Sequence, residues 1–181
     1  MESSSRIVIK RPSGMIAGIT AAWAIFGMFL AIDHELGLPP GALYERVGLT
    51  FGVDQSYALY VGFLLYMITA VIIGIAYSTI SNRVHILKIN SVVKGLGTGI
   101  LAGVIVWAVL FLPINYLVMQ PNLQHIIQQS PSSSVEYTMA KQFLELSSTI
   151  FWGSLALHIV FGGVMGFCAR LAVAETSIIH D

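Results

Sequence analysis

The stretch from residue 94 to residue 112, KGLGTGILAGVIVWAVLFL, constrains the fold of this chain most strongly. It carries no charge after Lys94, and it places Gly95, Gly99 and Gly103 four residues apart. This spacing puts the three glycines on one face of a helix. A face without side chains lets a second helix approach backbone to backbone, as helices do inside a lipid bilayer.

Composition points to the same solvent. The chain has 181 residues, of which 56% are hydrophobic and 10% are charged, whereas about a quarter of the residues of a soluble domain are charged. Four apolar runs are long enough to span a bilayer at roughly 20 residues per span. They cover residues 14–32, 57–80, 92–117 and 147–171. We therefore expect an all-α fold, a four-transmembrane-helix bundle that forms a single transmembrane domain in a lipid bilayer.

Charge asymmetry predicts the orientation of the spans. Most basic residues fall on one side of the expected membrane, namely Arg6, Lys10, Arg11, Arg83, Lys88, Lys94 and Arg170. The positive-inside rule then predicts a protein of the cell membrane with both termini in the cytoplasm. A net charge of zero argues against nucleic acid as a partner, and Cys168 as the single cysteine excludes an internal disulfide.

The two loops expected outside the cytoplasm contain helix signals. Residues 40–51 keep a helical period and predict a short helix at the membrane surface, with an ordinary loop as the alternative. Pro113 predicts a bend near the end of the third span. The apolar residues after Gln120 suggest a second interfacial piece. Ser133 and Glu136 have the spacing of a capping box, from which a helix is expected to run into the fourth span.

Two sequence offsets suggest an internal repeat of residues 12–80 in residues 92–171. A shift of 81 places Gly14 and Gly18 of the first span on glycines of the third, and a shift of 92 places Ala70 and Gly74 of the second span on glycines of the fourth. Two such halves would be parallel repeats. Chance matching among glycine-rich helices is the alternative.

The small residues predict where the helices pack. The positions expected to pack are Gly14, Gly18, Ala22, Ala70, Gly74, Gly95, Gly99, Gly103, Gly162 and Gly166. All lie in the half expected to face the cytoplasm, whereas most large aromatic residues of the first three spans lie in the other half. The bundle should therefore be tight in one half and splayed in the other. Packing within the chain is the simplest interpretation of the Gly95 face, and contact with another chain is the alternative.

Two groups of side chains are candidates for chemistry. Asp33, His34 and Glu35 follow the first span, and His125 or Glu136 could complete a site for a divalent metal ion with them. A solvated helix end is the alternative. His158 is an ionisable side chain well inside a span, where such residues are functional candidates. A structural hydrogen bond to Tyr66, Thr69 or Thr149 is the alternative to a ligand, cofactor or proton-relay role.

The segments DHELGLPPGALYERVGLTFG and LHIVFGGVMGFCARL resemble those of small, uncharacterised four-helix membrane proteins of archaeal type. The chain is more distantly similar to the YagU-like inner-membrane family, whose last helix has a comparable His-x-x-x-Gly-x-x-x-Gly motif, here His158, Gly162 and Gly166. This resemblance implies a fold and a membrane location, and it carries over no catalytic residue.

No nucleophile motif, phosphate-binding loop, dinucleotide fingerprint or zinc-binding spacing occurs in the sequence. We therefore expect a non-catalytic membrane protein that acts by helix packing, as an accessory subunit of a larger membrane complex or as a homo-oligomer. The resemblance to archaeal-type membrane proteins implies a membrane oxidoreductase, such as a monooxygenase, as one such complex. The alternative is a transporter or binding protein for a small solute or metal ion, with its site in the splayed half of the bundle. Catalysis is a third and weaker interpretation, and the sequence names no cofactor.

Overall fold

The structure is a computed structural model that describes the backbone of residues 11–178 and the side chains of residues 13–172. Every regular element in this range is a helix, which confirms the all-α expectation. The elements follow in the order α1 (Arg11–Glu35), α2 (Ala42–Thr50), α3 (Gln55–Arg83), η1 (His85–Leu87), α4 (Val92–Val106), η2 (Trp107–Phe111), α5 (Leu112–Ile114), η3 (Asn115–Met119), α6 (Gln120–Gln129), α7 (Val135–Glu145) and α8 (Ser147–Ile178).

Four helical stretches are long and apolar enough to cross a membrane. They are Ser13–Glu35, Gln55–Arg83, Val92–Gln129 and Ser147–Ala172. The protein is therefore a multi-pass membrane protein with four candidate spans. The third stretch has 38 residues and is about 57 Å long at ~1.5 Å per residue. It exceeds a hydrocarbon core of about 30 Å, so it extends well beyond one membrane boundary.

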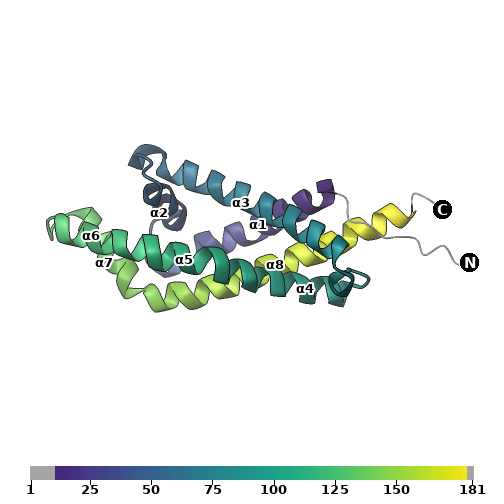
Figure 1. The fold of residues 1–181 in the computed structure, drawn as a ribbon. Coiled ribbons are helices and arrows are strands. Elements are labelled where there is room, and N and C mark those ends of the chain that lie inside the picture. The colour runs from purple at the N-terminus through teal and green to yellow at the C-terminus, as the bar shows by residue number, and fades with distance from the viewer. Residues whose placement is uncertain (1–10, 179–181) are drawn as a thin grey trace, which may run out of the picture.

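The long helices form two pairs, α1 with α3 and α4 with α8, and Figure 1 shows these pairs diverging toward the end that carries α2, α6 and α7. Helix α1 also packs against α8, which joins the two pairs. At this junction Ala17 and Ala21 of α1 lie in one core with Leu157, Phe161 and Met165 of α8. Small residues on one helix thus make room for large residues on the other.

The third span is a continuous rod from α4 to α6, and two of its turns are π-helical. The turns η2 and η3 lie on either side of Pro113. Proline has no N–H group, and its ring crowds the carbonyl four residues earlier, so a regular α-helix is disrupted there. A π-helical turn is wider and bonds each carbonyl to the fifth residue onward. The distortion expected at Pro113 therefore takes the form of two widened turns.

Two expectations about the segment from Gln120 to Glu145 were wrong. The residues after Gln120 do not form a separate interfacial piece, because the rod continues through Pro121 directly after the wide turn η3. Ser134, rather than Ser133, caps α7, and its side chain accepts the N–H of Tyr137 at 3.1 Å. Helix α7 then runs back along α6 and ends before Leu146, which separates it from α8.

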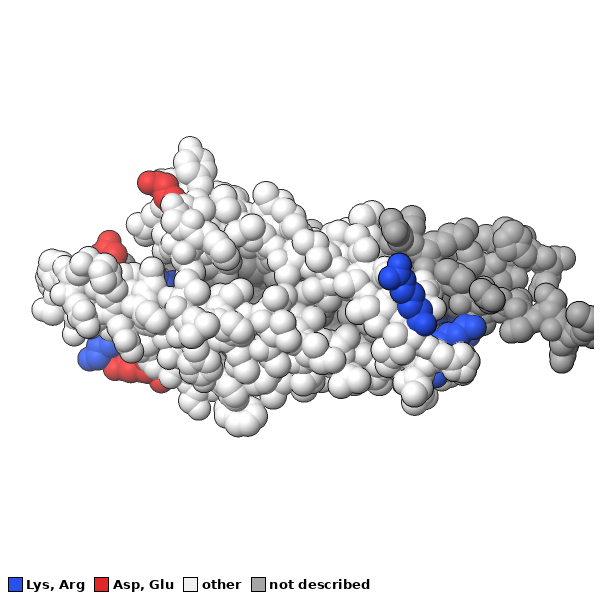
Figure 2. All heavy atoms as spheres, in the orientation of Figure 1, with Lys and Arg blue, Asp and Glu red and all other residues white. Residues whose placement is uncertain are grey.

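Charges divide between the two ends of the molecule. Figure 2 shows the visible Asp and Glu side chains at the end that carries α2, α6 and α7, and most visible Lys and Arg side chains at the opposite end. We call these the acidic end and the basic end. The basic end carries Arg83, Lys88 and Lys94 around the short helix η1. Polar groups at both ends and an apolar middle are what a bilayer requires.

Candidate functional site

Glycine contacts close the first helix pair near the basic end. A Cβ atom added at Gly14 of α1 would lie 2.7 Å from the carbonyl oxygen of Gly74 in α3, and one added at Gly18 would overlap the carbonyl of Ala70. The two backbones therefore touch. One turn farther toward the acidic end, the Tyr66 hydroxyl donates to the carbonyl of Ala22 at 2.9 Å.

The second helix pair closes in the same way. A Cβ atom at Gly95 of α4 would lie 2.8 Å from the carbonyl oxygen of Gly166 in α8, and Gly99 touches the carbonyl of Gly162. Gly103 lies against the backbone carbonyl of His158. All the positions expected to pack are thus used within the chain.

The two sets of contacts correspond under the sequence offsets of 81 and 92. A shift of 81 takes Gly18 to Gly99, and a shift of 92 takes Ala70 to Gly162. Gly18 contacts Ala70, and Gly99 contacts Gly162. The position of Tyr66 becomes that of His158. The duplication itself remains a prediction, although the packing pattern agrees with it.

Aromatic side chains occupy the acidic half of the first pair. Rings of α1, α2 and α3 contact one another with centroid distances of 5.3 to 6.4 Å, and the members are Trp23, Phe26, Phe29, Tyr44, Phe63 and Tyr66. Helix α2 is held in this group because Gly62 of α3 touches the carbonyl of Tyr44 and Gly48 touches that of Ala58. The bundle is therefore tight toward the basic end and splayed toward the acidic end, which confirms that expectation.

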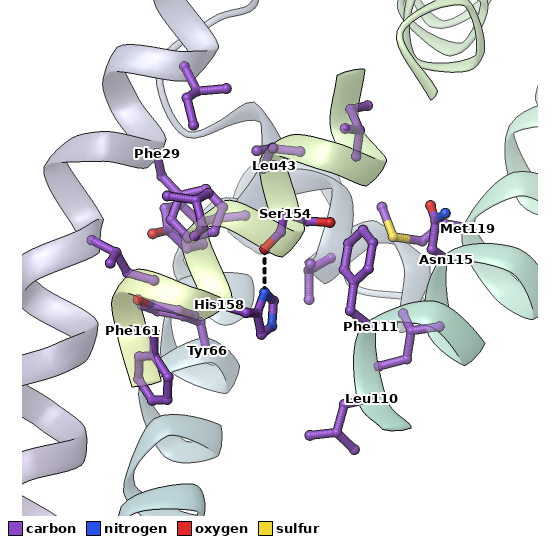
Figure 3. Close-up of a pocket in the computed structure, with 18 of the residues that line it drawn as sticks. Phe29, Leu43, Tyr66, Leu110, Phe111, Asn115, Met119, Ser154, His158 and Phe161 are labelled. Carbon is purple, nitrogen blue, oxygen red and sulfur yellow. Dashed lines mark hydrogen bonds between the residues drawn. The ribbon is translucent and has the colours of Figure 1, made fainter. Parts of the chain in front are cut away.

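A cavity of about 460 Å³ lies between the two pairs in the acidic half. All the long helices contribute to its wall, and most of the lining is apolar. Figure 3 shows Phe29, Tyr66 and Phe161 on one side, and Leu110, Phe111 and Met119 of the rod on the other. Both π-helical turns, η2 and η3, contribute lining residues. Such turns are frequent at functional sites because they redirect side chains.

His158 projects from α8 into this cavity, and its ring centroid lies 6.0 Å from that of Phe111 (Figure 3). Its Nδ1 lies 2.7 Å from the backbone carbonyl oxygen of Ser154. A partner in Tyr66, Thr69 or Thr149 was the wrong expectation, because the carbonyl one turn earlier on the same helix is nearer at hand. Because a carbonyl only accepts, Nδ1 carries the proton and Nε2 is left as an acceptor.

Asn115, at the start of η3, is a second polar side chain of the cavity wall. It is buried, and no hydrogen bond of its side chain occurs within the described residues. The sequence contained a usable signal, since an amide inside an apolar run is costly unless it finds a partner. Its direction could not be predicted, because the π-helical turn η2 changes the face on which it lies.

The residues suggested as metal ligands are not brought together. Asp33 is fully buried, and its Oδ2 accepts the N–H of Gly41 at 2.8 Å, just before α2. For Asp33 a solvated helix end was therefore also the wrong expectation, because the N–H groups at the start of α2 attract its carboxylate. His34, Glu35 and His125 are exposed. Within the described residues no three His, Cys, Asp or Glu side chains form a metal-binding group.

Arg46 of α2 is a buried cation that the sequence did not single out. Its Nη2 donates to Oδ1 of Asn122 in α6 at 2.8 Å, which ties α2 to the rod. Burial lowers the pKa of its guanidinium and raises the pKa of the neighbouring Tyr44 phenol. The guanidinium thus has a hydrogen-bond partner on another helix, and its role here is structural.

No protein-family model matches the chain, and neither does any curated protein or solved structure. The similarity to the YagU-like family therefore stays a prediction from the motifs. The geometry of the cavity is the basis for a functional proposal.

Proposed function

We propose that this protein is a membrane-embedded binding protein for a small apolar molecule, which occupies the cavity between the two helix pairs. The single observation that carries the proposal is the cavity itself, about 460 Å³ in volume and lined mostly by aliphatic and aromatic side chains. Small-molecule sites in proteins usually measure about 300–1,000 Å³ and have this kind of wall.

The surrounding structure supports this proposal over a purely structural role. Backbone contacts close each of the two pairs near the basic end. Near the acidic end α2 packs on α3 and reaches the rod through the bond from Arg46 to Asn122. The glycine faces that motivated the hypothesis of an accessory subunit are occupied inside the chain. A partner subunit would have to bind some other surface.

A cavity-filling variant tests the proposal. Gly153 lines the cavity, and a Cβ atom added there meets nothing within 4 Å, so Gly153→Leu should occupy part of the cavity without a clash at its Cβ atom. Gly97→Leu is the matched control, because Gly97 also faces open space but does not line the cavity. The probe is an apolar phenyldiazirine, photolysed with the protein in phosphatidylcholine nanodiscs and mapped by mass spectrometry.

We expect the probe to label cavity residues such as Phe111 and Leu157 in the wild-type protein and in Gly97→Leu. Gly153→Leu should show reduced labelling of the cavity residues and unchanged labelling of lipid-facing residues. Equal labelling of the cavity in all three proteins would contradict the proposal.

Membership of a larger membrane complex is the second candidate function, and it rests on the sequence. Native mass spectrometry in mild detergent tests it, and a monomer without any co-purifying protein would count against it. We further propose that the basic end faces the cytoplasm, which the distribution of Arg83, Lys88 and Lys94 supports through the positive-inside rule.

A further inference from the structure

Three hydroxyl groups of the cavity wall are already engaged. Tyr66 donates to the carbonyl of Ala22, and Thr69 donates to that of Leu65 at 2.8 Å. Ser154 donates to the carbonyl of Phe151 and accepts from Nε1 of Trp107 at 3.0 Å. The indole N–H of Trp107 is therefore also engaged. These groups line the wall without offering a ligand much polarity.

His158 differs from them. Its Nδ1 proton is used in the bond to Ser154, and its Nε2 lone pair has no partner within the described residues. Nε2 of His158 is not one of the unpaired polar atoms that are sealed off by surrounding atoms. A ligand in the cavity can therefore contact it. A free acceptor in an apolar cavity favours a ligand that brings a hydrogen-bond donor, namely an O–H or N–H group.

Resting on the proposed function, we infer that the ligand is a hydroxylated apolar molecule, an alcohol or a phenol, whose O–H donates to Nε2 of His158. The ring of Phe111 faces the imidazole across the cavity (Figure 3). It would flank the ligand beside its hydroxyl group. Most of the remaining wall is apolar and is suited to the hydrocarbon part of the molecule. Asn115, unpaired on the rod side of the cavity, supplies a polar group for a second oxygen atom where the ligand has one.

Two probes that differ by one hydroxyl group test this inference, 4-octylphenol and octylbenzene, each at the same mole fraction in phosphatidylcholine nanodiscs. Binding is measured by displacement of the phenyldiazirine label from the cavity. In addition, ¹⁵N NMR of histidine-labelled protein follows the Nε2 signal of His158, which the His158→Phe variant assigns.

In the wild-type protein we expect about tenfold tighter binding of 4-octylphenol, the size of effect that one hydrogen bond in an apolar site gives. Only 4-octylphenol should move the Nε2 signal. The preference should disappear in His158→Phe. It should remain in Thr69→Val, which removes a hydroxyl group that is already engaged.

The outcomes separate this inference from the proposed function. If both probes bind equally and the Nε2 signal does not move, His158 does not accept a hydrogen bond from the ligand. The inference then fails, while the proposed binding of an apolar molecule still holds. If neither probe displaces the label, both the inference and the proposed function fail. Loss of the preference in Thr69→Val would also overturn the assignment to His158.

Discussion

The contact between α4 and α8 gives a prediction whose size follows from the geometry. Gly99→Ala adds a methyl group that would overlap the carbonyl oxygen of Gly162 and lie 2.9 Å from the Cα atom of Gly166. Gly97→Ala is the matched control on the same helix, because its methyl group meets nothing within 4 Å. Both variants gain the same helix propensity, and they differ in the contact alone.

The expected magnitudes are opposite in sign. Alanine favours a helix over glycine by about 1 kcal/mol, so Gly97→Ala should raise the free energy of unfolding by about that amount. Forcing an extra methyl group into a packed interior costs about 1–3 kcal/mol. The upper value applies at Gly99, because backbone atoms cannot rotate away from the methyl group. The net loss there is about 2 kcal/mol, and the two variants should differ by about 3 kcal/mol.

Unfolding by sodium dodecyl sulfate in mixed micelles, followed by far-ultraviolet circular dichroism, measures this difference. Gly166→Ala should reproduce the loss from the other side of the contact. If Gly99→Ala is as stable as Gly97→Ala, the close approach of α4 and α8 is refuted. If the loss appears only at high protein concentration, the glycine face packs against a second chain.

Three further predictions concern two other contacts and the orientation in the membrane. Tyr77→Phe removes the hydroxyl that joins α3 to α4 and should lower the free energy of unfolding by about 1 kcal/mol in the same titration; no change would mean that the bond contributes nothing. The N–H of Ser56 donates to the Asp54 carboxylate and holds its pKa below 3.8. The stabilisation of the folded state by the ionised Asp54 carboxylate is complete above the pKa of the unfolded state. It is lost as the pH falls through the pKa of the folded state. The protection factors of the amides in the first turn of α3, which correct for the slower intrinsic exchange in acid, should therefore fall as the pH is lowered, and they should fall less in Asp54→Asn. In a Cys168→Ser background, a cysteine at Gln128 in intact cells should react with an impermeant maleimide, and protection there would reverse the proposed orientation.

The sequence determined the spans and the helix-packing face because both depend on local patterns. An apolar run of the right length needs no tertiary information, and the four-residue spacing of Gly95, Gly99 and Gly103 fixes a face of α4 whatever lies against it. The divergence of the pairs followed for the same reason, since small residues gather in one half of each span and aromatic residues in the other.

The parts of the site that could not be predicted depend on the course of the backbone. The π-helical turns beside Pro113 decide where Asn115 points, and no pattern in the sequence shows where such turns form. Asp33 was expected at the water interface, but α2 folds back over it and its N–H groups hold the carboxylate. The partner of His158 was sought on other helices, whereas the carbonyl of Ser154 lies one turn away.

The two π-helical turns also set an angle between the membrane part of the rod and its distal tip. An α-helix advances by about 100° per residue, so each turn that holds one additional residue rotates everything beyond it by about that angle. Deleting one residue from η2, such as Val109, removes this rotation together with the advance of about 100° that one residue makes. The two changes cancel, so Asn115 should keep its present azimuth. A deletion in α4, which has no widened turn, would instead rotate both Asn115 and Leu123 by about 100°. The widened turns therefore decide which deletions preserve the contact of Leu123 with α7.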